Sequence, residues 1–78
     1  MEIYDRYYRS ILAVEQELTN NPDSQILRDA LLTMCEMFLS IANPIAMNTE
    51  DEEMKKALAY LTSEVQEKIG RFNNKKTF

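Results

Sequence analysis

Apolar residues recur every three or four positions along three long segments of this 78-residue chain. In the first segment they occupy positions 4, 7, 11, 14 and 18, and the same spacing returns in two later segments. An α-helix turns once in 3.6 residues, so this spacing places the apolar side chains along one face of a helix. The sequence therefore predicts an all-α fold in a single domain, residues 1–78, with helices at about 3–19, 22–42 and 50–69. The tail 71–78 is expected to be frayed.

The predicted second helix is bounded by a proline near each end. Asn21 is interpreted as its N-cap and Pro22 as its first helical residue, a position that tolerates the missing proline N–H. Pro44 is expected to end this helix near residue 42, because a proline disfavours the helical conformation of the residue before it. The following residues, 45–48, are apolar for a loop. They are expected either to fold back over the core or to contact a partner.

The third predicted helix has the clearest end signals. Thr49 and Glu52 have the spacing of a capping box, in which the threonine side chain accepts a hydrogen bond from the Glu52 N–H and the glutamate side chain reaches back. Gly70 suits the position just beyond the helix end, because glycine readily takes up a left-handed conformation. These signals place the third helix at about 50–69.

The second segment is apolar around much of its circumference, which favours a central helix packed on two sides. A chain of this length buries only about 60–65% of its unfolded surface. Three helices with broad apolar faces therefore carry more apolar surface than a monomer can bury. We therefore expect a three-helix bundle, or an extended three-helix unit, that is completed by self-association as a two-fold homodimer. The acidic residues in 50–53 and the basic residues in 68–76 predict that two copies of the third helix pair antiparallel.

The composition excludes several classes of active site. A single glycine cannot form a Gly-rich nucleotide-binding loop, and the absence of histidine with only one cysteine removes the common zinc sites and nucleophile pairs. We expect no catalytic, cofactor-binding or metal-binding residues and no enzyme activity. Cys35 cannot form an internal disulfide, and no unbroken apolar run comes near the ~20 residues needed to cross a bilayer. A cytoplasmic location without a membrane segment is therefore predicted.

Aromatic, arginine and methionine side chains near the edges of the apolar stripes suit a surface that binds another protein, because protein interfaces are enriched in these residue types. We predict a small protein–protein interaction module of bacterial or phage type, which acts as an adaptor, a chaperone or an inhibitor of a larger protein. The residues predicted to contact the partner are Tyr8, Arg9, Met37, Ile45 and Met47.

The alternative is a nucleic-acid-binding regulator. Between Tyr4 and Arg9 the chain interleaves aromatic and basic side chains, which could stack on bases and contact phosphates. The C-terminal tail is basic as well, with Arg71, Lys75 and Lys76. The net charge of the whole chain is −4, however, and an acidic protein repels phosphate. Protein binding is therefore favoured over nucleic-acid binding.

Overall fold

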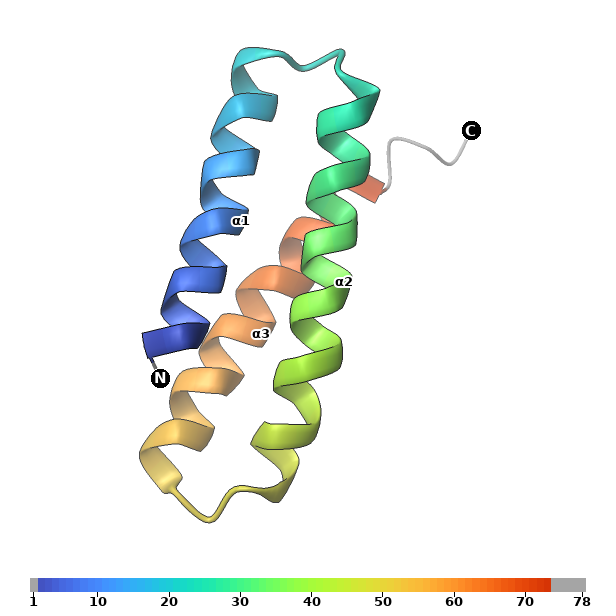
Figure 1. The fold of residues 1–78 in the computed structure, drawn as a ribbon. Coiled ribbons are helices and arrows are strands. Elements are labelled where there is room, and N and C mark those ends of the chain that lie inside the picture. Colours follow the sequence, from blue (N-terminus) through green and yellow to red (C-terminus); the bar gives the residue numbers. More distant parts are fainter. Residues whose placement is uncertain (1, 74–78) are drawn as a thin grey trace.

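In a computed structural model, which describes residues 2–73, the chain folds into three α-helices joined by two short turns (Figure 1). Helix α1 spans Glu2–Asn20, α2 spans Gln25–Asn48 and α3 spans Glu52–Asn73. The predicted all-α class and the predicted number of helices are confirmed over the described residues. The end of the predicted frayed tail, with Lys75 and Lys76, lies outside them.

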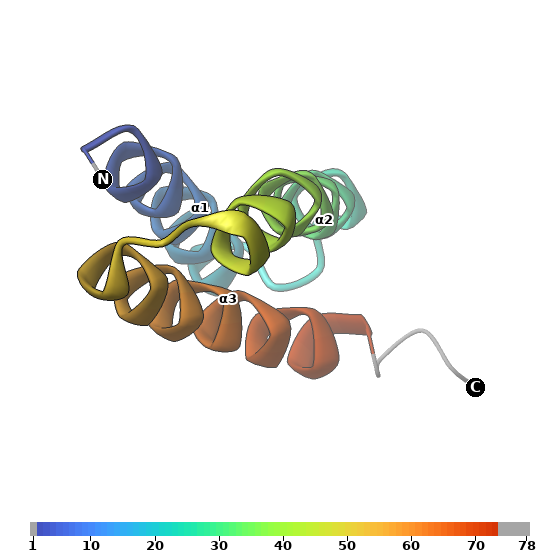
Figure 2. The same cartoon turned by 90° about the horizontal axis from the view of Figure 1, so that it is seen from below.

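Helices α1 and α2 lie side by side and run in opposite directions, and α3 crosses one side of the pair (Figure 1). Seen from below, α3 lies under both α1 and α2, and no described element covers their other side (Figure 2). Helix α2 packs against both neighbours, and its packing against α3 is the most extensive between any two described helices. The prediction that the second helix is the central one is therefore confirmed.

The molecule is flat, with principal extents of 42 × 25 × 15 Å. Its radius of gyration, 13.3 Å, exceeds the ~11 Å expected for a compact domain of this length. The short axis has room for only two layers of helix, because packed helices lie about 8–10 Å apart. The side of α1 and α2 that turns away from α3 is therefore a surface and not part of the core.

The core lies where the three helices meet, and Phe38 of α2 is its largest fully buried side chain. The Phe38 ring meets Tyr7 of α1 edge to face, with 5.5 Å between the ring centroids. The other buried residues of the core are Ile11, Leu18, Leu31, Cys35, Ala42, Leu58, Leu61 and Val65. Most of them belong to the apolar stripes of the three predicted helices, so these stripes supply most of the buried core.

The turn between α1 and α2 differs from the sequence prediction. Ser24, and not Asn21, is the N-cap of α2, because its side-chain oxygen accepts a hydrogen bond from the Leu27 N–H at 3.2 Å. Asn21 instead closes the end of α1, where its backbone N–H and its side-chain amide both donate to the Glu17 carbonyl, at 3.0 and 3.1 Å. Helix α2 therefore begins beyond Pro22, which lies in the turn.

Helix α2 continues past Pro44 for a further turn, whereas the sequence predicted an end near residue 42. A proline inside a helix removes one backbone hydrogen bond and costs about 3 kcal/mol. The last turn offsets part of this loss, because Ile45 and Ala46 pack against the core. The helix is then closed by the Thr49 N–H, which donates to the Ile45 carbonyl at 2.9 Å. The segment after the proline is therefore the last turn of α2 and not a loop: Ile45 and Ala46 pack against the core, whereas Met47 is 82% exposed.

Asp51, and not Thr49, caps α3. The Asp51 carboxylate accepts hydrogen bonds from the N–H groups of Glu53 and Met54, at 3.1 and 3.3 Å. The Thr49 hydroxyl oxygen accepts only from the Asp51 N–H, at 3.2 Å. The predicted capping box between Thr49 and Glu52 is therefore wrong, since a carboxylate that binds two N–H groups outcompetes a hydroxyl at the helix start.

We expect Asp51→Ala to lower the free energy of unfolding by about 0.5–2 kcal/mol, the usual effect of losing an N-cap side chain. Thr49→Ala should have a smaller effect, because its hydroxyl oxygen accepts one hydrogen bond outside the helix. Urea unfolding followed by circular dichroism measures both changes. A larger loss for Thr49→Ala than for Asp51→Ala would contradict this assignment of the cap.

Gly70 lies inside α3, so its predicted position beyond the helix end is wrong. Its backbone φ is not positive, and the helix continues for three more residues. Two of these residues explain the continuation. Phe72 packs against the core, and Arg71 binds a carboxylate of α1, so both contribute contacts that a frayed tail would lose.

Gly70→Ala is expected to raise the free energy of unfolding by about 0.5–1 kcal/mol, because alanine favours the helix and restricts the unfolded chain. A Cβ atom at this position would meet no other atom within 4 Å, so the substitution introduces no clash. Chemical denaturation of the two proteins measures the difference. Unchanged or reduced stability would show that Gly70 is needed for a conformation other than a regular helix.

Charged side chains join α1 to α3. The Lys68 Nζ lies 2.7 Å from Glu15 Oε1, and the Arg71 guanidinium lies 3.0 Å from Oε2 of the same carboxylate. Lys68 is only 6% exposed, so this contact forms largely within the protein interior. Two basic residues of α3 are thus already paired within the chain. The charge pattern predicted an antiparallel pairing of two α3 helices. That prediction has less support, because two of the basic residues it relies on bind Glu15 of the same chain.

Candidate functional site

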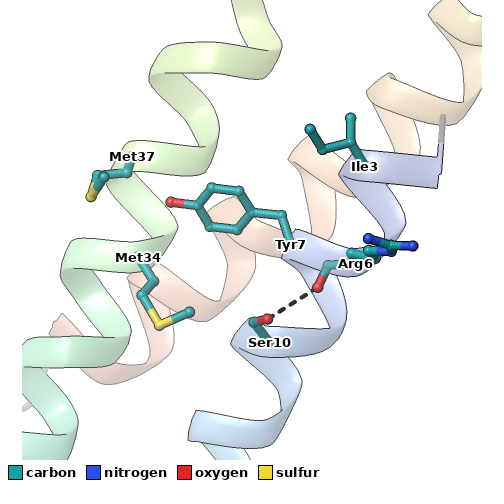
Figure 3. Close-up of a pocket in the computed structure, with 6 residues that line it drawn as sticks. All are labelled: Ile3, Arg6, Tyr7, Ser10, Met34 and Met37. Atoms are coloured by element: carbon teal, nitrogen blue, oxygen red, sulfur yellow. Dashed lines mark hydrogen bonds between the residues drawn. The ribbon is translucent and has the colours of Figure 1, made fainter.

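An open groove lies between α1 and α2, on the side that turns away from α3. It has a volume of about 450 Å³ and is lined by residues of both helices, namely Ile3, Arg6, Tyr7, Ser10, Met34 and Met37. We call it the α1–α2 groove. Figure 3 shows Tyr7 and its neighbours on α1 at one wall, the two methionines of α2 at the other, and α3 behind.

Helical spacing brings the lining residues together. Ile3, Tyr7 and Ser10 are three or four positions apart on α1, and the two methionines are three apart on α2, so each set shares one helix face. The Tyr7 ring reaches from α1 toward α2 (Figure 3), and its edge-to-face contact with Phe38 holds it there. The Ser10 hydroxyl donates to the Arg6 carbonyl at 3.1 Å, which satisfies its one donor and leaves the groove largely apolar.

Large apolar side chains are exposed in and beside the groove. Met37 is 52% exposed, Ile3 is 71% exposed, and Ile41, one turn beyond Met37, is 45% exposed. We call the surface formed by the α1–α2 groove and Ile41 the open face. Apolar side chains that are exposed singly are normal on proteins, whereas a group of them on one face indicates a binding surface.

Among the five predicted partner-binding residues, only Met37 lines the groove. Tyr8 is half-buried and packs against the core, and burial together with the nearby Glu64 carboxylate raises its pKa. Because Glu64 belongs to α3, Tyr8 points to the opposite side of α1 from the groove. Ile45 is half-buried and packs against the core as well.

Arg9 and Met47 are exposed, but neither belongs to the open face. Arg9 precedes the fully buried Ile11 by two positions, so it projects away from the core, and it does not line the groove. Met47 is 82% exposed and lies on the last turn of α2, beyond Pro44. The structure therefore does not bring the five predicted residues onto one surface.

Five of the six groove residues, all except Met37, are absent from the sequence-based prediction of the site. The sequence interpretation assigns Tyr7 to the buried stripe of the first helix, whereas the structure places Tyr7 and Met34 at the edge of the core, facing the groove. Ile3 lines the groove with 71% of its surface exposed. The signal that could have identified them is the width of the stripes. A stripe much wider than the ~100° that faces a core leaves apolar positions uncovered at its edge.

Helix α2 is the one helix in the described part of the chain that is long and apolar enough to cross a membrane, by length and composition only. Of its most apolar window, 28% is buried. The core helix of a soluble protein passes the same test, so the predicted absence of a membrane segment stays a prediction. The finding does agree with the open face, because both show that much of the apolar surface of α2 is uncovered.

Cys35 is buried among the three helices, and burial raises the pKa of its thiol from 9.0 to about 11. The thiol is therefore protonated at neutral pH and is a poor nucleophile. Among the described residues, no group of three or more His, Cys, Asp or Glu side chains could hold a metal ion.

We expect Cys35 to be alkylated far more slowly in the folded protein than in urea, since only the exposed thiolate reacts. The pH dependence follows from the same pKa. The unfolded thiol ionises near pH 9.0 and the folded thiol near pH 11, so this contribution to stability is present below pH 9 and is lost as the pH rises toward 11. Mass spectrometry after iodoacetamide treatment measures the labelling. Equal rates in the folded and unfolded protein would contradict the burial of Cys35.

Comparison with known proteins found no matching family model, no matching curated protein and no matching solved structure. The strongest functional feature of the chain is the open face, where an apolar groove, exposed apolar side chains and an uncovered side of two helices coincide.

Proposed function

We propose that this chain is a small protein–protein interaction module that binds its partner through the open face. The observation that carries the proposal is the α1–α2 groove, with Met37 and Ile41 exposed on a side that no described element covers. Removing apolar surface from water is the dominant favourable contribution to most protein–protein association. An apolar surface of another protein is therefore the occupant that such a face favours.

The residue types of the open face support protein binding and not catalysis. Met34 and Met37 are flexible and polarizable, so they can adapt to the shape of a partner. We propose that the module acts in the cytoplasm as an adaptor, a chaperone or an inhibitor of a larger protein, and that it has no enzyme activity. A cytoplasmic location suits the single Cys35, which has no internal partner for a disulfide.

The nucleic-acid alternative has less support. Tyr4 and Tyr8 are half-buried and pack against the core, so part of each ring is unavailable for stacking on bases. Arg71 is one of the basic residues that the nucleic-acid alternative assigns to phosphate contacts, and it already binds the Glu15 carboxylate. The net charge of −4 also opposes binding to a polyanion.

A pull-down from cells that make the protein tests the proposal, with wild type, Met37→Glu and Gln66→Glu as baits. Both substitutions introduce a carboxylate at an exposed helical position, but Gln66 lies on α3, away from the open face. We expect wild type to capture a protein that nuclease treatment does not release. Met37→Glu should lose this protein and Gln66→Glu should retain it.

Two results would contradict the proposal. Capture that nuclease abolishes would favour the nucleic-acid alternative. Equal capture by Met37→Glu and Gln66→Glu would show that binding does not depend on the open face.

A further inference from the structure

The open face has a self-complementary pattern of apolar and charged residues. From this pattern we infer that its occupant is a second copy of this chain, related to the first by a two-fold axis that runs along the α1–α2 groove. The inference rests on the proposed function, an interaction module that binds through the open face, and makes a second copy, in place of a larger protein, the partner at that face. It also replaces the antiparallel pairing of two α3 helices that the sequence predicted.

The broad side of the molecule is large enough for a stable dimer interface. The molecule measures 42 × 25 × 15 Å, so this side extends over 42 by 25 Å. A standard protein–protein interface buries roughly 800 Å² on each partner, which fits within a face of these dimensions. Two copies stacked by their broad sides would also supply each other with the layer of helices that covers α1 and α2.

The contacts between α1 and α2 fix which of their residues lie at the same height along the groove. The Tyr7 ring contacts Phe38, which is next to Met37 in the chain. Because α1 and α2 run in opposite directions, residues earlier in α1 lie beside residues later in α2 (Figure 1). Ile3 therefore lies near the height of Ile41, one helical turn away from Tyr7 and Met37.

A two-fold axis along the groove preserves these heights and exchanges the two helices. It places α2 of one copy over α1 of the other, so that Ile41 faces Ile3 and Met37 faces Tyr7. Each of these pairs joins side chains that are exposed or half-buried in the single chain. Two-fold symmetry repeats both pairs on the other side of the axis, as a closed dimer requires.

The two edges of the open face have opposite charge near the same height. Arg6 lines the groove at its α1 edge. Glu36 is exposed and lies two positions from Phe38, hence about 200° around α2 from the side that faces α1, at the outer edge. Within residues 2–73, no ion pair uses either side chain.

This charge pattern distinguishes between the possible two-fold axes. An axis along the groove brings Arg6 of one copy toward Glu36 of the other, and it does so twice in the dimer. An axis across the groove would instead bring each of these residues toward its own equivalent, so that like charges would meet. Opposite charges steer association and fix the register of an interface, and they favour the axis along the groove.

Sedimentation equilibrium of the purified full chain tests the inference. We expect wild type to be mainly dimeric at ~100 μM, and we expect Arg6→Glu or Glu36→Arg alone to raise the Kd of the dimer about tenfold or more. The double variant, with both substitutions, should return the Kd to within roughly threefold of wild type, because the pair is restored with its charges exchanged. Lys56→Glu is the matched control, since it makes the same charge change as Arg6→Glu at an exposed position of α3.

Three results would overturn the inference: a monomeric wild type at ~100 μM, a double variant no tighter than the single ones, or a Lys56→Glu effect equal to that of Arg6→Glu. Circular dichroism verifies folding of each variant, and both exchanged residues are good helix formers. If wild type is monomeric and Met37→Glu loses the captured protein, the dimer inference is wrong and the proposed binding of another protein is supported. If wild type is a dimer whose Kd follows the charge exchange and it captures no other protein, the dimer is supported and the binding of a larger protein is contradicted.

Discussion

Phe38→Ala is expected to lower the free energy of unfolding by about 3–5 kcal/mol, the range observed when a buried aromatic residue is truncated. The Phe38 side chain is 1% exposed, and its ring contacts Tyr7 edge to face. The substitution therefore leaves a cavity between α1 and α2 and removes a favourable ring pair. Since small domains are stable by only ~5–15 kcal/mol, much of the stability of this chain would be lost. Urea unfolding followed by circular dichroism measures the change.

Two leucines provide the comparison for Phe38. Leu31→Ala should also be costly, by about 2–5 kcal/mol, because Leu31 is fully buried in the core. Leu12 is 37% exposed at the side of α1, so Leu12→Ala should cost less than about 1 kcal/mol. A smaller loss for Phe38→Ala than for Leu12→Ala would show that the buried faces of α1 and α2 are wrongly assigned.

The buried faces of the helices could be predicted from the sequence. Leu31 and Phe38 lie in an apolar stripe that repeats with the period of a helix, and a stripe of that kind must be covered wherever the helix packs. The same reasoning applies to Leu58, Leu61 and Val65 of α3. Helix number, helix order and most of the core follow from this local pattern, which needs no knowledge of how the helices are arranged.

The helix ends were harder to predict, because several neighbouring residues could form each end. Thr49 and Asp51 are both good N-caps, and the choice between them depends on which backbone N–H groups are free. The Thr49 hydroxyl oxygen accepts from the Asp51 N–H, and Asp51, which directly precedes α3, accepts from the N–H groups of Glu53 and Met54. At Pro44 the local preference for a helix end is overridden by the burial of Ile45 against the core.

The candidate site could be predicted only in part. The sequence predicts Met37 as a contact residue from its place at the edge of a stripe, but it assigns Tyr7 to the buried stripe of the first helix. A stripe shows that part of a helix is apolar, and it does not show which part a neighbouring helix will cover. That depends on α3 packing on one side of α1 and α2, a long-range arrangement that leaves the other side open (Figure 2).

Glu15→Ala is expected to lower the free energy of unfolding by about 3 kcal/mol, the lower end of the ~3–5 kcal/mol range for breaking a buried ion pair. The Glu15 carboxylate is 2.7 Å from Lys68 Nζ, and the Lys68 side chain is 8% exposed. Removing the carboxylate leaves an ammonium group in the interior without its counter-charge. Arg71 loses a partner too, but it is half exposed and remains within 3.2 Å of Glu67, so it contributes less to the loss.

Lys68→Met should lower the free energy of unfolding much less than Glu15→Ala. The difference between the two variants tests whether the unpaired ammonium group causes the loss. Methionine fills the space of the lysine stem with an apolar side chain, and Glu15 keeps Arg71 as a partner at 3.0 Å. Glu67→Ala, which removes only the exposed pair with Arg71, is the surface control and should cost roughly 0–1 kcal/mol. Urea unfolding of the three variants under identical conditions gives their order. If Glu15→Ala costs no more than Lys68→Met, the buried lysine does not depend on this carboxylate, and the contact contributes little to holding α1 against α3.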